Sequence, residues 1–167
     1  YLIYDLEFGL GYNGSVTNNM LSVARNASPH NYNSDLFKYF TQNATFKRYF
    51  INRYADLVNT IFLPSNVQAN AYLLRDSLKY DYHLQSEKWG GIDSATWITN
   101  IASMLSFANS RPTYARNFVQ SEFQLSGQVT LTLQVSPAGA GVVQISTITP
   151  STYPWNGVYF NGNPVTI

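Results

Sequence analysis

Two acidic residues near the start of the chain, Asp5 and Glu7, have the spacing of side chains that share one cation. They follow a β-prone run of aromatic and branched residues, Tyr1–Tyr4. On an extended strand, residues two apart point to the same face and lie about 6.6 Å apart. Gly9 and Gly11 come next, and glycine permits positive φ angles and close backbone approach. Asp5 and Glu7 are therefore the candidate metal ligands, and an edge strand that ends in an acidic loop is the alternative interpretation.

The order of strand, carboxylate and glycine turn is also the one with which a kinase holds Mg²⁺ against the phosphates of ATP. The polar stretch after the turn, residues 13–34, occupies the place of a kinase activation segment. A plain surface loop, with a short helical turn at residues 19–24, is the favoured interpretation of that stretch. The elements that would position the carboxylates are predicted from the rest of the chain.

The composition narrows the possible functions. The chain has 167 residues, 45% of them hydrophobic, which suffices for one domain with a sizeable core. Only 11% of the residues are charged, against about 25% in ordinary soluble domains, a balance common in secreted and cell-surface bacterial proteins. The net charge of +1 gives no electrostatic argument for binding nucleic acid or an anionic membrane. There is no cysteine and no apolar run long enough to predict a membrane span.

Apolar residues recur with helical spacing between residues 34 and 122, which predicts a mainly helical body. The expected caps and breaks are Ser34-Asp35, Asn43, Pro64-Ser65, Gly90-Gly91, Asp93 or Ser94, and Arg111-Pro112. The third helix is expected to end near His83, and the fourth at Arg111, because the residue before proline disfavours the α conformation. The expected core side chains are Phe46, Phe50, Leu57, Leu74, Trp97, Ile101 and Leu105.

From residue 125 the hydrophobic period changes to 2, which predicts strands. Residues 129–135 are expected to form a hairpin with residues 142–148, and residues 158–160 a further hairpin with residues 165–167. We place a domain boundary between residues 124 and 125. Two strands alone are marginal in water, so this β segment is expected to be a weak partner of the helical body, either docking on it or pairing with the edge of a neighbouring chain.

A few other residues could carry chemistry or packing. We expect Arg53 and Asp56 to pair on a helix flank and Arg111 to act at a helix end. His83, at a helix end near Trp89, is expected to be a packing residue, and a ligand role is the alternative. His30 has no companion histidine or cysteine, which makes it a weak metal ligand. The tail also contains four aromatic residues that could form a sugar- or peptide-binding platform or, alternatively, a buried hairpin core. These residues are Tyr153, Trp155, Tyr159 and Phe160.

The order of these features resembles the CotH family, the kinase-like relatives of spore-coat protein H. The matching stretches are Tyr4–Gly9, Leu36-Phe37, Asn43–Phe50, Arg53–Thr60, His83, Trp89, Trp97 and Phe107–Arg111. The tail, Phe123–Gly127 and Gly157–Gly162, is similar to the β-rich segment that follows this domain in secreted bacterial members.

The resemblance implies an α+β protein. Residues 1–124 would be the mainly helical C-terminal lobe of an atypical protein-kinase-like fold, and residues 125–167 a small, incomplete antiparallel β segment. It also implies that the parent protein uses ATP and Mg²⁺ to phosphorylate a protein substrate. Asp5 would match the metal-binding aspartate of the kinase Asp-Phe-Gly position. Glu7 stands where many members are expected to have a second aspartate.

The resemblance leaves several parts of a kinase without a counterpart in this sequence. The glycine-rich lid, the strand lysine, its partner glutamate and the catalytic aspartate all normally precede the metal-binding aspartate. We therefore expect a fragment of a secreted or surface bacterial kinase that has no complete catalytic set and binds neither ATP nor Mg²⁺ tightly. The alternative is a non-catalytic structural or adhesion module of a bacterial surface or spore-coat-type protein. In the first case the Asp5 carboxylate lies exposed in a cleft, and in the second it is capped or paired.

Overall fold

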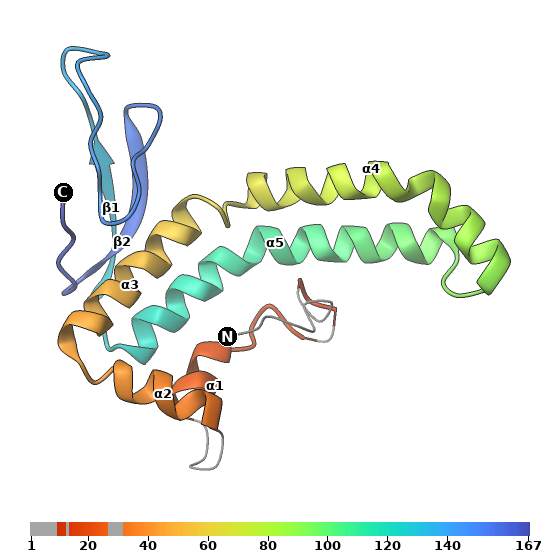
Figure 1. Ribbon diagram of the computed structural model, residues 1–167, viewed down its shortest axis with the longest axis horizontal. Helices are drawn as coiled ribbons and strands as arrows, with labels where there is room; N and C mark the ends of the chain where they lie inside the picture. Colours follow the sequence, from red (N-terminus) through yellow and green to blue (C-terminus); the bar gives the residue numbers. More distant parts are fainter. Residues whose placement is uncertain (1–9, 13, 27–31) are drawn as a thin grey trace. The chain divides into compact units, whose positions relative to one another are not determined.

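The structure is a computed structural model that describes residues 10–12, 14–26 and 32–167. Its elements are α1 (Met20–Asn26), α2 (Tyr32–Phe40), α3 (Ala44–Asn59), α4 (Pro64–Trp89), α5 (Ser94–Glu122), β1 (Gly127–Leu133) and β2 (Trp155–Asn161) (Figure 1). Helices together with an antiparallel sheet confirm the predicted α+β class. Within the described part of the chain, no helix has an apolar stretch long enough to cross a membrane.

Packing divides the chain into two compact units. The first unit combines residues 1–18 with residues 61–114, and the second combines residues 19–60 with residues 115–167. Helix α5 contributes to both units, because the division falls within it. The boundary that we place between residues 124 and 125 concerns folding domains and remains a prediction.

In the first unit, α4 and the first part of α5 lie side by side and run in opposite directions (Figure 1). The Gln68 side chain donates a hydrogen bond to the Leu105 carbonyl over 3.3 Å. Nearer the far end of the pair, the Tyr82 ring stacks on the Trp97 ring with centroids 4.8 Å apart. Helix α4 begins with Pro64 at its first position, where the missing N–H costs nothing, and continues past His83 to Trp89.

Helix α5 corrects one prediction, because Arg111-Pro112 does not end it. Proline removes one helical hydrogen bond and clashes with the preceding turn. Packing outweighs this cost, because Ala108, Pro112, Ala115 and Val119 are all buried and follow one another at intervals of three or four residues. A continuous buried face therefore carries the helix through the proline as far as Glu122.

Helix α3 dominates the second unit and was predicted well. Asn43 caps it, since its side-chain oxygen accepts a hydrogen bond from the Phe46 N–H over 3.0 Å. The preceding helix, α2, starts at Tyr32, two residues before its expected cap. The buried core of this unit consists of Ile51, Ala55, Val119, Phe123, Leu133, Ile145, Tyr159 and Phe160, with Phe50 packed against it. Leu74 of the first unit, expected in the core, is 64% exposed, and that prediction was wrong.

The β segment forms a different hairpin from the one expected. Strand β1 pairs antiparallel with β2, from Gly127 opposite Asn161 to Leu133 opposite Trp155. Residues 142–148 form only an isolated bridge between Ile145 and Ile148, and residues 165–167 form no strand. The reason is that residues 145–148 bind elsewhere: Ile145 is buried in the core, and the Thr147 N–H donates to Asp56 of α3. Contacts between α3 and β2 confirm that the β segment docks on a helix.

Candidate functional site

The two predicted metal ligands, Asp5 and Glu7, lie outside the described residues, as does His30. Within the described ranges, no group of three or more histidine, aspartate or glutamate side chains is placed to hold a metal ion. The assignment of Asp5 and Glu7 as ligands therefore stays a prediction.

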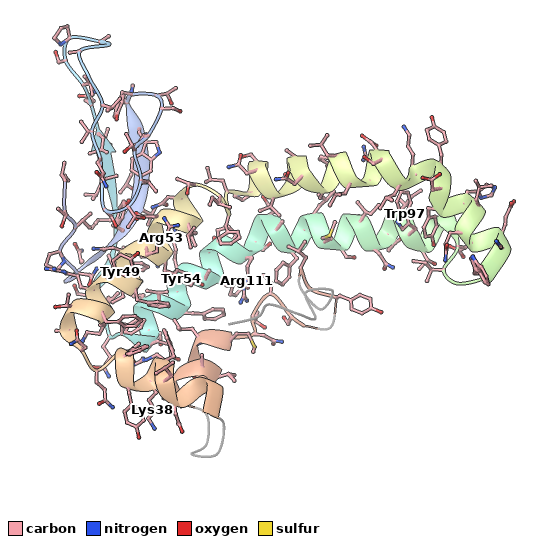
Figure 2. All side chains as sticks on the ribbon, viewed as in Figure 1. Lys38, Tyr49, Arg53, Tyr54, Trp97 and Arg111 are labelled. Carbon is pink, nitrogen blue, oxygen red and sulfur yellow. The ribbon has the colours of Figure 1, made fainter. Side chains whose placement is uncertain are left out.

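Residues 10–12 and 14–18, which follow these carboxylates in the sequence, are described and belong to the first unit with the first part of α5. Gly11 has a φ of +88°, and a Cβ atom there would stand 2.8 Å from the Phe107 ring. This is the positive φ and close backbone approach predicted for the glycine turn. Further along, Arg111 of α5, labelled in Figure 2, donates from one guanidinium nitrogen to the Val16 carbonyl over 2.7 Å and to the Asn18 carbonyl over 3.0 Å. Gly11, Val16 and Asn18 thus contact the same part of α5.

The best-formed polar cluster in the second unit lies on the buried face of α3. Asn52, Asp56 and Asn59 occur at intervals of four and three residues, and all three are buried. Asp56 accepts hydrogen bonds from the Tyr159 hydroxyl over 2.6 Å, the Thr147 N–H over 2.9 Å and the Thr147 hydroxyl over 2.7 Å. A buried carboxylate needs this number of donors, because an unpaired buried charge is strongly unfavourable. The cluster is closed to solvent and serves to bind the β segment.

The two asparagines bind backbone groups of the same segment. The Asn59 side chain donates to the Val158 carbonyl over 2.9 Å and accepts from the Val158 N–H over 3.0 Å, so it occupies one position on the free edge of β2. Arg116 donates to the same Asn59 oxygen over 3.0 Å. The Asn52 side chain donates to the Pro164 carbonyl over 2.9 Å. We did not predict this polar stripe, and its only signal in the sequence is three short polar residues at helical spacing among Ile51, Ala55 and Val58.

Several predicted residues have other roles than expected. Arg53 does not pair with Asp56, because both bind Thr147: the Arg53 guanidinium donates to the Thr147 hydroxyl over 2.7 Å. Arg111 lies inside α5 and not at a helix end. His83 is exposed, and its Nε2 atom lies 3.1 Å from a carboxylate oxygen of Glu87 one turn further along α4, so the expected packing role was wrong.

The aromatic residues of the tail belong to the core. Tyr159 is fully buried and Phe160 is 3% exposed, while Tyr153 and Trp155 pack against the same core. The Tyr153 hydroxyl is also bonded to the backbone of Val143. The buried-core interpretation is therefore confirmed for Tyr159 and Phe160, whereas Tyr153 and Trp155 are partly buried against the same core.

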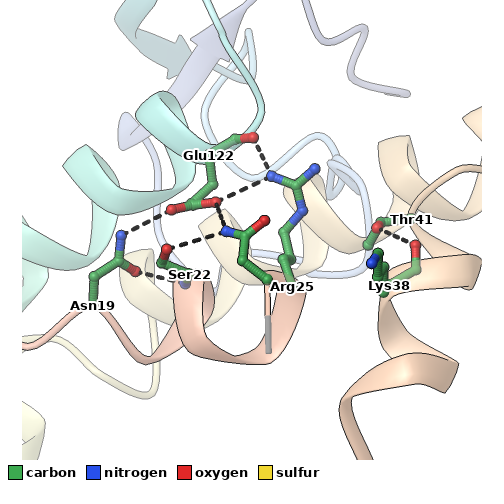
Figure 3. A network of polar contacts seen from close by, with 7 residues as sticks. Asn19, Ser22, Arg25, Lys38, Thr41 and Glu122 are labelled. Carbon is green, nitrogen blue, oxygen red and sulfur yellow. Dashed lines mark hydrogen bonds and ion pairs between the residues drawn. The ribbon is translucent and has the colours of Figure 1, made fainter. Parts of the chain in front are cut away.

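A second polar network fixes the short helix α1, which buries no residue. Figure 3 shows the Glu122 carboxylate at its centre, accepting from Asn19 over 3.1 Å and from Arg25 and Asn26 over 3.3 Å each. The Arg25 guanidinium also donates to the Glu122 carbonyl and lies 4.5 Å from the centre of the Phe123 ring. Glu122 at the end of α5 therefore adds polar contacts to α1, whose Leu21 also packs against the hydrophobic core.

Two shallow clefts of the second unit offer no acid–base or metal chemistry. One, of about 310 Å³, is lined by Asn117, Gln120, Ser121, Gln124 and Leu125. The other, of about 270 Å³, is lined by residues 44–48 of α3, Phe46 excepted, and by Gly162, Asn163 and Pro164. Neither cleft contains an acidic residue or a histidine.

These observations define a mainly helical α+β protein in which the described polar clusters are closed and structural. Comparison with known families adds what the geometry leaves open: residues 1–115 match the family model described as CotH kinase protein. This match covers more than half of the chain and includes Asp5 and Glu7, so the chain belongs to the CotH kinase protein family. Searches of the curated proteins and of the solved structures found no match.

Proposed function

We propose that the parent protein is a CotH-type kinase that transfers phosphate from ATP to a protein substrate at a bacterial cell surface or outside the cell. The observation that carries this proposal is the family match over residues 1–115, which contains the acidic stretch. The low charged content of 11% supports a secreted or surface location. In this proposal Asp5 binds the divalent cation, and Glu7 is its second ligand or supports it.

The requirements of phosphoryl transfer determine which catalytic parts this chain could supply. Catalysis depends on positioning and on neutralising the phosphate charge, through the cation, a lysine, a lid and a catalytic aspartate. Mg²⁺ demands near-octahedral oxygen ligands, so one or two carboxylates leave it mostly hydrated and weakly held. We therefore propose that these 167 residues supply the metal carboxylate and its helical support, and do not transfer phosphate by themselves.

The experiment uses the full natural protein beside the 167-residue chain. We expect Mg-ATP-dependent phosphate incorporation with the full protein, abolished by Asp5→Ala and retained by Asp81→Ala, which removes a carboxylate from the exposed surface of α4. Calorimetry of the 167-residue chain with Mg-ATP should show no micromolar binding. Undiminished activity of the Asp5→Ala protein would remove Asp5 from the metal site. Micromolar binding by the short chain, lost in Asp5→Ala, would show a complete nucleotide site within it.

One observation favours the second candidate, a non-catalytic structural or adhesion module. The most elaborate polar cluster of the described residues, around the fully buried Asp56, binds the β segment and has no access to solvent. A full natural protein that folds but incorporates no phosphate with Mg-ATP or Mn-ATP would support this candidate over the kinase.

A further inference from the structure

The hydrogen bonds of β2 determine which backbone groups of β1 face outward. The Asn59 side chain of α3 binds both the N–H and the carbonyl of Val158, at 3.0 and 2.9 Å, so both groups point away from β1. Val158 stands opposite Thr130 in the antiparallel pair. Residues opposite each other in such a pair either exchange both hydrogen bonds or exchange neither. The N–H and the carbonyl of Thr130 therefore point away from β2, toward the outer edge of β1.

The same alternation places two more residues of β1 on this outer edge. Backbone groups two positions apart in a strand point the same way, so Gln128 and Thr132 share the orientation of Thr130. In the part of the chain that the structure describes, the sheet has two strands, and no backbone hydrogen bond joins β1 to a segment other than β2. The side chains of these three residues are exposed as well. The outer edge of β1 thus presents a full row of donors and acceptors to a further strand.

Strand β1 has none of the features in its sequence that usually protect a sheet edge. Natural edges are protected by lysine, proline, bulges or a covering element. Residues 127–133 read Gly-Gln-Val-Thr-Leu-Thr-Leu and contain neither a charged residue nor a proline. Their pairing with β2 is regular from Gly127 to Leu133, without a bulge. An uncharged and regular edge of this kind favours pairing with another strand.

The sequence of β1 is complementary to itself. We propose that two copies of the chain pair antiparallel through β1, with Thr130 on the two-fold axis. This register places Thr130 opposite the partner's Thr130, Gln128 opposite the partner's Thr132, and Val129 opposite the partner's Leu131. All outward backbone groups of the strand then find partners, polar side chains meet polar ones, and apolar side chains meet apolar ones. The interface is isologous and brings no charges together, as a two-fold dimer requires.

The size of this contact determines the expected affinity. Stable protein–protein interfaces bury at least about 1,200 Å², and a single pair of seven-residue strands supplies less. We therefore expect a weak dimer with a Kd between about 10 μM and 1 mM. The net charge of +1 per chain opposes such self-association only slightly. This inference goes beyond the proposed function and does not depend on it.

Sedimentation equilibrium of the 167-residue chain tests the pairing. The apparent mass of the wild type should rise with concentration toward that of a dimer. Thr130→Lys and Thr130→Asp each place two like charges opposite each other, so each should raise the Kd of the dimer about fivefold or more. An equimolar mixture of the two variants places opposite charges there and should restore association. Thr99→Lys, which changes an exposed threonine of α5, is the matched control and should leave the Kd unchanged.

Cross-linking tests the register, because the chain contains no cysteine of its own. Hydrogen-bonded antiparallel partners have Cα atoms about 5.5 Å apart, which is within disulfide range. Thr130→Cys should therefore form a covalent dimer on oxidation about tenfold faster than Thr99→Cys. If the charged variants fail to fold, as judged by circular dichroism, this comparison still tests the proposal.

Three results would overturn the self-pairing of β1. The first is a wild-type chain that stays monomeric up to about 1 mM, which would leave the edge to a strand of another protein. The second is an unchanged Kd in a folded Thr130→Lys protein. The third is cross-linking of Thr130→Cys no faster than that of Thr99→Cys.

Discussion

Removing the Asp56 carboxylate is the sharpest test of how the β segment is held. Asp56 is fully buried and accepts from the Tyr159 hydroxyl, the Thr147 N–H and the Thr147 hydroxyl, all between 2.6 and 2.9 Å. The substitution Asp56→Ala leaves these donors facing a small cavity between α3 and the β segment. The donors belong to residues more than 90 positions away in the sequence, so the loss affects the tertiary structure and not the helix alone.

The expected cost follows from those contacts. Each buried donor left without a partner costs about 1–3 kcal/mol. The Thr147 N–H and the Tyr159 hydroxyl are both part of this buried cluster, so Asp56→Ala should lower the free energy of unfolding by about 2–6 kcal/mol. That is a large fraction of the total stability of a small domain, about 5–15 kcal/mol. Tyr159→Phe removes one donor and leaves Thr147 in place, so it should cost only about 1.5–3 kcal/mol.

Urea denaturation of the 167-residue chain, followed by circular dichroism, measures these differences. Asp81→Ala, an exposed carboxylate removal on α4, should stay within about 0.5 kcal/mol of the wild type. The double variant Asp56→Ala/Tyr159→Phe should cost less than the sum of the single variants, because the two residues share one hydrogen bond. A loss below about 1 kcal/mol for Asp56→Ala, or additive single costs, would contradict our account of the cluster.

Two further predictions concern Tyr159 and Glu122. Burial, followed by the hydrogen bond to Asp56, raises the pKa of Tyr159 above the ordinary tyrosine value of about 10, so the unfolded chain loses this proton first as the pH rises. The stability that Tyr159 contributes is therefore complete below about pH 10, and above that pH it falls by up to about 1.4 kcal/mol per pH unit. Urea denaturation at several pH values between about 9 and 11.5 measures this fall, and the variant Tyr159→Phe should lack the contribution of Tyr159 to it. Glu122→Ala should loosen α1, because Asn19, Arg25 and Asn26 lose their shared acceptor, while the packing of Leu21 against the core remains. Amide exchange in Met20–Asn26 should then become faster while α3 stays protected, and unchanged exchange would show that packing alone holds α1.

Local signals in the sequence predicted the elements that local interactions determine. Asn43 caps α3 as expected, and Asp93 caps α5 through a 2.6 Å bond from the Thr96 N–H. The end of α5 was missed because proline disfavours the helix locally, whereas the buried face that overrides it is a tertiary feature. The expected hairpin failed for the same reason. Residues 142–148 have a strand pattern, but Thr147 is bound by Asp56, 91 positions earlier in the chain.

The candidate metal residues could be predicted from the sequence, whereas the buried polar stripe on α3 could not. Asp5 and Glu7 could be named as candidates from their spacing on an expected strand, and the family match over residues 1–115 supports the resemblance that gave them a role, which itself stays a prediction. The stripe of Asn52, Asp56 and Asn59 could not be recognised, because polar residues on a helix usually face solvent. Only the partners in the β segment, far away in the sequence, show that this face is buried.

The buried polar stripe of α3 also shows how the residues after the family match pack on a helix inside it. The family match stops at residue 115, yet the core of the second unit takes Ile51 and Ala55 from inside the match and Val119, Phe123 and Leu133 from beyond it. A carboxylate on the buried face of a helix is tolerated only when donors surround it, and the donors to Asp56 come from Thr147 and Tyr159. The residues after the match therefore complete the burial of a helix that lies inside it. The β segment is thus part of the fold of α3, whichever of the two proposed functions the protein performs.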